Sequence, residues 1–259
     1  MKKREYNKLT IKEILNHQTE IDTRGAAQVL KVSESTVRRI FSELVKDGSA
    51  IRTFGGIRTV EIPTREYSFD IHESAFIAAK RTIASVAHKL IENGDIVFLD
   101  SGTTTLQLAH IIAEQARNGD YKELRVVTNS LAHLYVLVPY CNVTLIGGQF
   151  REKRRDFVGY TSYLALKNMN FTISFLGADG FSIKDGFSAT DEDTAQYAST
   201  VIERSRKVVI LFDASKLDFP SYITYAKVSH IDTIITNAQL NREQQKVLKK
   251  AGVTYLYCS

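Results

Sequence analysis

The chain has 259 residues, of which 44% are hydrophobic, and it carries 34 Lys and Arg against 29 Asp and Glu. This length exceeds the usual size of one domain and predicts two. No apolar run could span a membrane, the basic N-terminus lacks a signal peptide's apolar core, and Cys141 and Cys258 lie far apart without metal-binding spacing. We therefore expect a cytoplasmic protein with no membrane segment, metal or disulfide.

The positive charge is unevenly distributed. Residues 1–60 hold 12 Lys and Arg against 7 Asp and Glu, whereas residues 61–259 hold 22 of each. A basic module joined to a neutral one indicates a part that binds a polyanion, carried by a second part with another task. Charge alone does not exclude a chance clustering of surface lysines.

Three helices and a hairpin are predicted in the basic part. A first helix has an apolar stripe at Leu9, Ile11, Ile14 and Leu15, and a second spans 24–30, with Asp22 or Thr23 as its cap. The third runs from the N-cap Ser33 to Gly48, and its buried stripe comprises Val37, Ile40, Phe41, Leu44 and Val45. Residues 49–58 read as two short strands that turn near Gly55 and Gly56. This order predicts a winged helix-turn-helix over residues 1–58.

The third helix is the candidate DNA-reading element. Its polar face combines short hydroxyls near its start with adjacent arginines, which suits entry into a major groove. The candidate DNA contacts are Ser33, Ser35, Thr36, Arg38, Arg39 and Ser42, with Arg52 and Arg58 on the wing. Most helices with a basic face are merely solvated, so the neighbouring helices and wing are what favour DNA binding.

Residues 59–74 contain Pro63 and no sustained periodicity, so we interpret them as a connector to a second domain at 75–259. Short apolar runs and helices alternate there, which indicates an α/β domain with a mostly parallel sheet covered on both faces. The predicted strands are 96–99, 124–127, 143–146, 171–176, 208–212, 233–236 and 253–257, and the predicted helices are 75–92, 105–117, 130–138, 162–167, 193–205 and 242–251.

Ligands of such sheets bind beyond the carboxyl ends of the strands. After the first strand, Asp100 is followed by Ser101, Gly102, Thr103 and Thr104 at the start of a helix. Backbone N–H groups and hydroxyls at a helix N-terminus form a good phosphate cradle. The segment lacks the lysine of an ATP-binding loop and the spacing of a dinucleotide fingerprint, so a small phosphorylated molecule fits better. A simple capped turn is the equally weighted alternative.

Other strand ends carry polar or glycine residues, at 127–130, 146–148, 176–180 and 211–216. Asp100 and Asp179 could accept hydrogen bonds from sugar hydroxyls, and Lys216 could pair with a phosphate or carbonyl oxygen. For Asp213 we prefer a turn cap, and for Asn129 a helix cap and a ligand contact are equally weighted. The basic run 151–155 could help hold a phosphate, but we interpret it as a solvated loop.

These residues resemble the DeoR family of bacterial sugar-metabolism repressors. The family pattern is matched by Val32-Ser33, Thr36, Arg38-Arg39, Leu44, Gly48, Arg52 and Gly55-Gly56, and later by the Asp-Ser-Gly-Thr-Thr, Thr-Asn, Gly-Gly, Gly-Ala-Asp-Gly and Asp-Ala-Ser-Lys segments at the strand ends. The chain departs from the pattern with Ile40-Phe41 in place of Asp-Leu, with Phe54 in place of His, and with Thr194 before Ala195.

The resemblance implies a ribose-5-phosphate-isomerase-like second domain that senses a phosphorylated sugar and releases DNA. By the same likeness Ser101, Gly102, Thr103 and Thr104 bind phosphate, and Asp100, Asn129, Asp179 and Lys216 contact the sugar. With the neighbouring strand-end residues Thr128, Gly147, Gly148 and Gly177, these form the predicted effector site.

We therefore predict a DNA-binding regulator, a repressor of a carbohydrate utilisation operon. It would be a homo-oligomer, dimer or tetramer, that binds operator DNA and a sugar phosphate and needs no cofactor. The alternative is an isomerase-like enzyme in which Lys184, Glu192 and Asp179 move protons. A winged helix-turn-helix would be an unnecessary attachment for such an enzyme, and a pure scaffold would not explain the polar strand ends.

Overall fold

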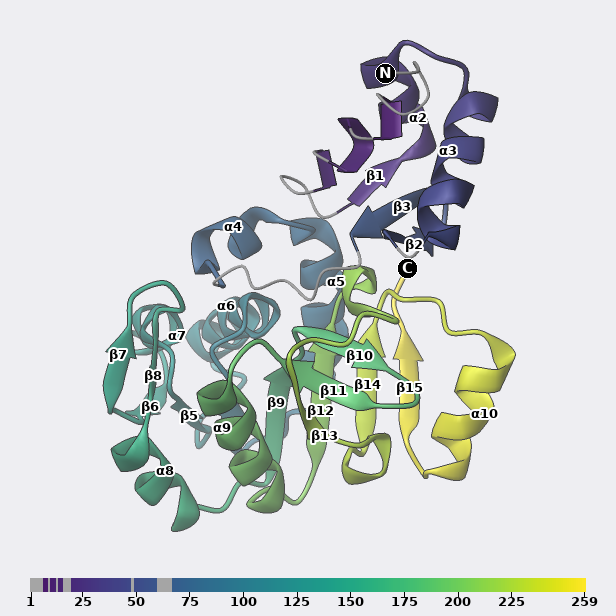
Figure 1. Cartoon of the computed structure of the whole chain (residues 1–259). Helices are drawn as coiled ribbons and strands as arrows, with labels where there is room; N and C mark the ends of the chain where they lie inside the picture. The colour runs from purple at the N-terminus through teal and green to yellow at the C-terminus, as the bar shows by residue number, and fades with distance from the viewer. Residues whose placement is uncertain (1–6, 9, 13, 16–19, 48, 60–66) are drawn as a thin grey trace. The chain divides into compact units, whose positions relative to one another are not determined.

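A computed structural model of the chain describes residues 7–8, 10–12, 14–15, 20–47, 49–59 and 67–259. It consists of two compact units, Met1–Ile62 and Pro63–Ser259. Each unit has its own hydrophobic core. Figure 1 shows the helices and strands of both units.

The N-terminal unit is a helix-turn-helix with a three-stranded wing. The described residues between 7 and 15 are helical, and α2 (Thr23–Leu30) and α3 (Glu34–Lys46) follow. The strands β1 (Glu20–Asp22), β2 (Ala50–Thr53) and β3 (Gly56–Thr59) pair antiparallel in the order β1-β3-β2. Of these three strands, β1 was not predicted. Buried Ile21 brings β1 into the sheet opposite Ile57, a long-range pairing that local sequence does not encode.

The helix N-caps and the hydrophobic core of the N-terminal unit are those that the sequence predicts. Ser33 Oγ accepts a hydrogen bond from Thr36 N at 3.3 Å, and Asp22 Oδ1 accepts one from Gly25 N at 2.6 Å, so both N-caps are confirmed. The stripe predicted for the third helix is buried at Val37, Ile40, Phe41 and Leu44, with Val45 packed against it. Leu9 of the first stripe and Gly48 lie outside the described residues.

The C-terminal unit is built on a seven-stranded parallel sheet in the order β15-β14-β12-β9-β4-β5-β6. The strands are β4 (Ile96–Leu99), β5 (Arg125–Thr128), β6 (Asn142–Leu145), β9 (Ile173–Gly177), β12 (Val208–Phe212), β14 (Thr233–Thr236) and β15 (Thr254–Tyr257). The helices are α5 (Ile77–Ala87), α6 (Thr103–Asn118), α7 (Leu131–Leu137), α8 (Tyr160–Lys167), α9 (Glu192–Glu203) and α10 (Arg242–Lys250). The predicted fold class, a winged helix-turn-helix followed by a mostly parallel α/β domain, is confirmed.

Both faces of this sheet are buried, which explains the continuous apolar runs of its strands. Val97 and Leu99 pack with residues of α5, α6 and α7, whereas Phe98 between them packs with residues of α8, α9 and α10. The chain proceeds from β4 through β5 to β6, and then returns to the other side of β4 with β9. The strand order therefore reverses between β4 and β9, which is where an α/β sheet opens its ligand crevice.

Smaller elements around the sheet were not predicted. They are the hairpin β7 (Gln149–Arg151) and β8 (Asp156–Val158), the sheet of β10 (Gly180–Ser182), β11 (Gly186–Ala189) and β13 (Ile223–Ala226), and the helix α4 (Phe69–Ser74). Their strands have three or four residues and lack the apolar runs of the main sheet, and β13 pairs with β11 from far along the chain.

The predicted connector 59–74 is wrong over its second half, because Phe69 is buried and α4 packs on α6. Over the residues that the structure describes, none of the helices combines the length and the apolar character that crossing a bilayer requires.

Candidate functional site

The polar face of α3 is exposed as predicted. Ser33, Ser35, Arg38, Arg39 and Ser42 are exposed, and Thr36 is half-buried, on the side away from the buried stripe. Arg38 forms an ion pair with Glu34 at 3.2 Å, one helical turn earlier. The helix therefore offers hydroxyls in its first turn and two guanidinium groups beside them, which matches the needs of major-groove reading.

The two wing arginines differ in their exposure to solvent. Arg52 on β2 is exposed, but Arg58 on β3 is only 8% exposed and lies opposite Glu20 of β1 in the sheet. The prediction that Arg58 faces DNA phosphates is therefore wrong. Because the unpredicted strand β1 pairs with β3, Arg58 lies on the central strand of a three-stranded sheet and not on a strand of a two-stranded hairpin.

The second candidate site lies at the carboxyl edge of the parallel sheet, where the strand order reverses. Asp100, directly after β4, accepts hydrogen bonds from Gly177 N at 2.6 Å, from Gly102 N at 2.7 Å and from Thr105 Oγ1 at 3.0 Å. Burial raises the pKa of Asp100, and these hydrogen bonds oppose that shift. Asp100, predicted as a sugar contact, thus ties the ends of β4 and β9 together beneath the crevice.

The N-terminus of α6 lies at the same edge of the sheet, just after β4. Gly102 is its N-cap without a side-chain cap hydrogen bond, while Thr103 and Thr104 are 6% and 7% exposed. Ser101 Oγ donates to Asp156 Oδ2 at 2.9 Å. Orphan N–H groups at the start of a sixteen-residue helix favour an anion there, which agrees with the predicted phosphate cradle.

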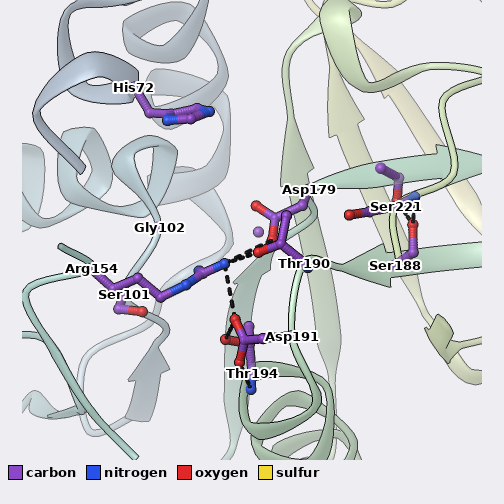
Figure 2. Close-up of polar contacts among 12 residues, drawn as sticks. His72, Ser101, Gly102, Arg154, Asp179, Ser188, Thr190, Asp191, Thr194 and Ser221 are labelled. Atoms are coloured by element: carbon purple, nitrogen blue, oxygen red, sulfur yellow. Dashed lines mark hydrogen bonds and ion pairs between the residues drawn. The ribbon is translucent and has the colours of Figure 1, made fainter. Parts of the chain in front are cut away.

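Two arginines of the basic run face the same crevice, so its interpretation as a solvated loop is wrong for them. Arg151 donates from Nε and Nη2 to the two oxygens of Asp156, at 2.8 and 2.7 Å, and from Nη1 to Asp191 Oδ1 at 2.8 Å. Arg154 lies 3.3 Å from Asp179 Oδ2 and 3.1 Å from Asp191 Oδ2 (Figure 2). The hairpin β7–β8 turns both side chains inward, and a charge pattern gives no sign of that hairpin.

Asp179 is held ionised by its surroundings. Burial alone would raise its pKa, but the charges of Arg154 and Lys216 and two hydrogen bonds from Thr190 keep it below the ordinary value. The sugar contact predicted for Asp179 thus has a charged acceptor available. Thr190, which sequence reasoning missed, donates to Asp179 from its N and Oγ1, and Asp191, also missed, reaches the site through Arg154, which pairs with both carboxylates.

The remaining predicted effector residues also lie at strand ends. Thr128 ends β5 and Asn129 follows it, and both are buried; Gly147 and Gly148 lie after β6 and are exposed; Gly177 ends β9; and Lys216 closes a short 3-10 turn after β12. Asn129 Nδ2 donates to Phe157 O at 3.0 Å, and Ser130, not Asn129, caps α7. Asn129 Oδ1 is buried without a hydrogen-bond partner in the part of the chain that the structure describes. An unpaired buried acceptor at this edge is available to a hydroxyl donor.

Other residues of the sequence analysis do not join the crevice. Asp213 caps its own turn by accepting from Ser215 N at 2.9 Å, which confirms the preferred interpretation. Glu192 is exposed and accepts from Tyr222 OH at 2.8 Å, and Lys184 is exposed between β10 and β11. No hydrogen bond or ion pair links either of them to Asp179 among the described residues. Within these residues no group of His, Cys, Asp and Glu is arranged to hold a metal ion.

A DNA-reading helix on one unit and a polar crevice on another define a ligand-responsive DNA-binding protein. Comparison with family models agrees: residues 9–62 match the DeoR-like helix-turn-helix domain, and residues 75–238 match the DeoR C-terminal sensor domain. The chain belongs to the DeoR family of transcriptional regulators.

Curated relatives match over almost the whole chain. The HTH-type transcriptional regulator GlpR of Haloferax volcanii is 31% identical over 226 residues, which are 87% of this chain and 86% of that protein. The putative aga operon transcriptional repressor of Escherichia coli O157:H7 is 28% identical, covering 92% and 88%. The lactose phosphotransferase system repressor of Staphylococcus epidermidis is also 28% identical, covering 92% and 93%.

Solved structures resemble the chain more distantly. A D-ribose-5-phosphate isomerase in complex with phospho-erythronic acid has a TM-score of 0.41 and 16% identity, and covers 53% of this chain and 52% of that one. The eIF2B delta subunit of Chaetomium thermophilum has a TM-score of 0.47 and 16% identity, covering 66% and 60%. At these values the likeness says nothing about activity.

Proposed function

We propose that this protein is a repressor of a carbohydrate utilisation operon and that a phosphorylated sugar, bound at the crevice of the sensor unit, controls its binding to operator DNA. Several relatives are named as repressors of sugar operons, which supports the operon class. The protein would act in the cytoplasm, where both DNA and phosphorylated sugars are found, and would need no cofactor.

The observation that carries the effector class is the chemistry of the crevice. The open N-terminus of α6 suits a phosphate, and Lys216 adds a positive charge near Asp179. The ionised Asp179 and the unpaired Asn129 Oδ1 suit hydroxyl donors. A ligand with one phosphate and several hydroxyls satisfies all of these groups, and a free sugar or inorganic phosphate satisfies only some.

Control of DNA binding follows from a difference in affinity. An oligomer, a dimer or a tetramer, would present paired α3 helices to half-sites about one helical turn apart or multiples of it. The sugar phosphate would favour a state whose helices no longer match that spacing, by as much as its affinities for the two states differ.

The test is a mobility shift with the DNA upstream of the gene, at fixed salt, with and without a panel of glucose 6-phosphate, fructose 1-phosphate and ribose 5-phosphate. We expect a specific shift that one sugar phosphate abolishes. Lys216→Ala should keep the shift and lose the response. A protein that gives no specific shift would not be the proposed repressor.

The competing function is an isomerase-like enzyme. Incubation of the purified protein with each sugar phosphate, followed by separation of the products, decides between the two. We expect no interconversion of aldose and ketose phosphates. Turnover that Asp179→Asn abolishes would favour the enzyme.

A further inference from the structure

The segment Tyr67–Ser74, called here the roof segment, lies outside both family models, which cover residues 9–62 and 75–238. The structure nevertheless ties it to the effector crevice. Phe69 N donates to Lys153 O at 2.8 Å, and the Asp70 carboxylate pairs with Arg155 at 2.5 Å. Both partners belong to the β7–β8 turn, which also supplies Arg154 to the crevice. The segment is therefore fixed to a wall of the site.

Two rings of the roof segment face the crevice. The Tyr67 and His72 rings stack with centroids 4.6 Å apart and planes 10° from parallel. The Arg154 guanidinium lies 4.0 Å from the centre of the Tyr67 ring while it contacts Asp179. Figure 2 shows the His72 imidazole extending from its helix toward the gap between Gly102 and Asp179. The Tyr67 ring thus contacts the ion-paired Arg154 guanidinium, and His72 joins the site through its stack with Tyr67.

The protonation of His72 gives it a defined chemistry. Its Nδ1 lies 2.8 Å from Ser68 O, and since a carbonyl only accepts, Nδ1 carries the proton. Burial lowers the pKa of His72, with the charge of Lys216 in the same direction, so the ring is neutral near pH 7. Nε2 is then a hydrogen-bond acceptor. An acceptor beside a flat aromatic surface is suited to a sugar, whose hydroxyls donate and whose C–H groups pack on rings.

We propose that Tyr67 and His72 form the roof of the effector site and bind the sugar part of the ligand, His72 Nε2 accepting from a hydroxyl and Tyr67 holding that ring in place through its stack with Arg154. This inference rests on the proposed function and adds to it the residues that bind the sugar part of the ligand. The sheet edge binds the phosphate, and the roof segment distinguishes a sugar phosphate from phosphate alone. Ligand binding thereby engages residues that come directly before the matched sensor domain in the sequence.

The test uses the full-length protein and two probes, inorganic phosphate and the panel of sugar phosphates used above. His72→Phe keeps a ring for stacking and removes the acceptor. We expect its dissociation constant for the effective sugar phosphate to rise at least tenfold, and that for inorganic phosphate to change less than twofold. Phe76→Ala, which removes an exposed aromatic ring two residues after the roof segment, is the matched control and should bind both probes as the parent does.

A direct reporter complements the binding constants, because the chain contains no tryptophan. Tyr67→Trp places a single indole in the roof, and we expect its emission to change with the same midpoint as the release of operator DNA. Two outcomes would contradict the proposed role of Tyr67 and His72 without contradicting the proposed repressor function. One is a His72→Phe variant that binds the sugar phosphate as the parent does. The other is an indole emission that does not change with a sugar phosphate that releases DNA. If the parent neither binds the panel nor responds to it, the proposed function fails, and the roof with it.

Discussion

Arg151 and Asp156 form a bidentate ion pair across the β7–β8 hairpin, with N···O distances of 2.8 and 2.7 Å and an Asp156 side chain that is only 1% exposed. Asp156 also accepts from Ser101, so one buried carboxylate joins the hairpin to the turn between β4 and α6. The pair therefore holds the β7–β8 hairpin against the residues that follow β4.

Asp156→Asn should destabilise the sensor unit by about 2–3 kcal/mol, because it leaves the partly buried Arg151 without its main counter-charge. The free energy of unfolding from urea titration measures this loss. The matched control is Asp70→Asn, which breaks an exposed pair with Arg155 and should cost no more than about 0.5 kcal/mol. If the two variants lose equal amounts of unfolding free energy, the buried Arg151–Asp156 pair does not stabilise the unit more than an exposed pair does.

Arg39→Ala should weaken operator binding by about 10- to 100-fold, since a groove contact of an arginine contributes roughly 1–3 kcal/mol. Arg39 is exposed on α3, so the fold should not change. Binding is measured by mobility shift at several salt concentrations, with Arg117→Ala on α6 as the charge-matched control. If Arg39→Ala and Arg38→Ala both bind operator like the parent, α3 does not read the DNA.

Arg52→Ala and Arg58→Ala should have opposite consequences. Arg52 is exposed, so its loss should reduce the affinity for all DNA sequences and lower the salt slope by about 1. Arg58 is buried in the wing, so its loss should instead lower the thermal midpoint of the N-terminal unit. Calorimetry and mobility shifts on both variants separate the two effects; a thermally unchanged Arg58→Ala that binds DNA poorly would restore the original prediction for this residue.

Gly147→Ala should affect ligand binding, whereas Gly148→Ala should affect the stability of the fold. A Cβ at Gly147 would meet no atom within 4 Å, whereas one at Gly148 would overlap Ser162 Oγ and come within 2.5 Å of Val158 O. Gly148→Ala should therefore cost about 1–3 kcal/mol of stability through overpacking. Gly147→Ala should fold like the parent and bind the sugar phosphate less tightly, as isothermal titration would show. Parental affinity in Gly147→Ala would place the ligand away from this strand end.

Stability should fall in mild acid because of His133. Burial lowers the pKa of this fully buried ring to about 3, although the Thr105 backbone offsets part of the effect. The unfolded chain binds a proton near pH 6.5 and the folded one does not, so the contribution of neutral His133 is present above pH 6.5. It is lost by roughly 1.4 kcal/mol per pH unit as the pH falls from 6.5 toward 3. His133→Leu should show a shallower pH dependence of unfolding between pH 6.5 and 4.5, and equal slopes would show that His133 is protonated in the folded state.

The sequence predicted well the elements whose signals are local. Ser33 caps α3 because its hydroxyl needs only an N–H three residues later, and the stripe from Val37 to Leu44 needs only helical spacing. The strand-end turn at Asp100–Thr104 was identifiable for the same reason, since a glycine and hydroxyls between a strand and a helix are a local pattern.

Local patterns could not predict the surroundings of residues that depend on contacts between segments far apart in the sequence. Arg151 and Arg154 looked like solvated charges until the β7–β8 hairpin turned them toward Asp156 and Asp179. Arg58 looked exposed until β1 covered it. Tyr67 and His72 lay in a stretch without periodicity, and only their stack beside Arg154 reveals a possible binding role.

By itself, the sequence determined the class of this protein: a basic helix-turn-helix unit, a neutral α/β unit, and polar residues at the strand ends of the second unit. These follow from short-range rules of capping, periodicity and strand-end chemistry. Only the tertiary structure decided which charges face the crevice and which side chains cover it, because burial and ion pairing depend on strands and turns that meet from far apart in the chain. Asp179 illustrates this difference: its motif is local, but its charge is maintained by Arg154, Lys216 and Thr190.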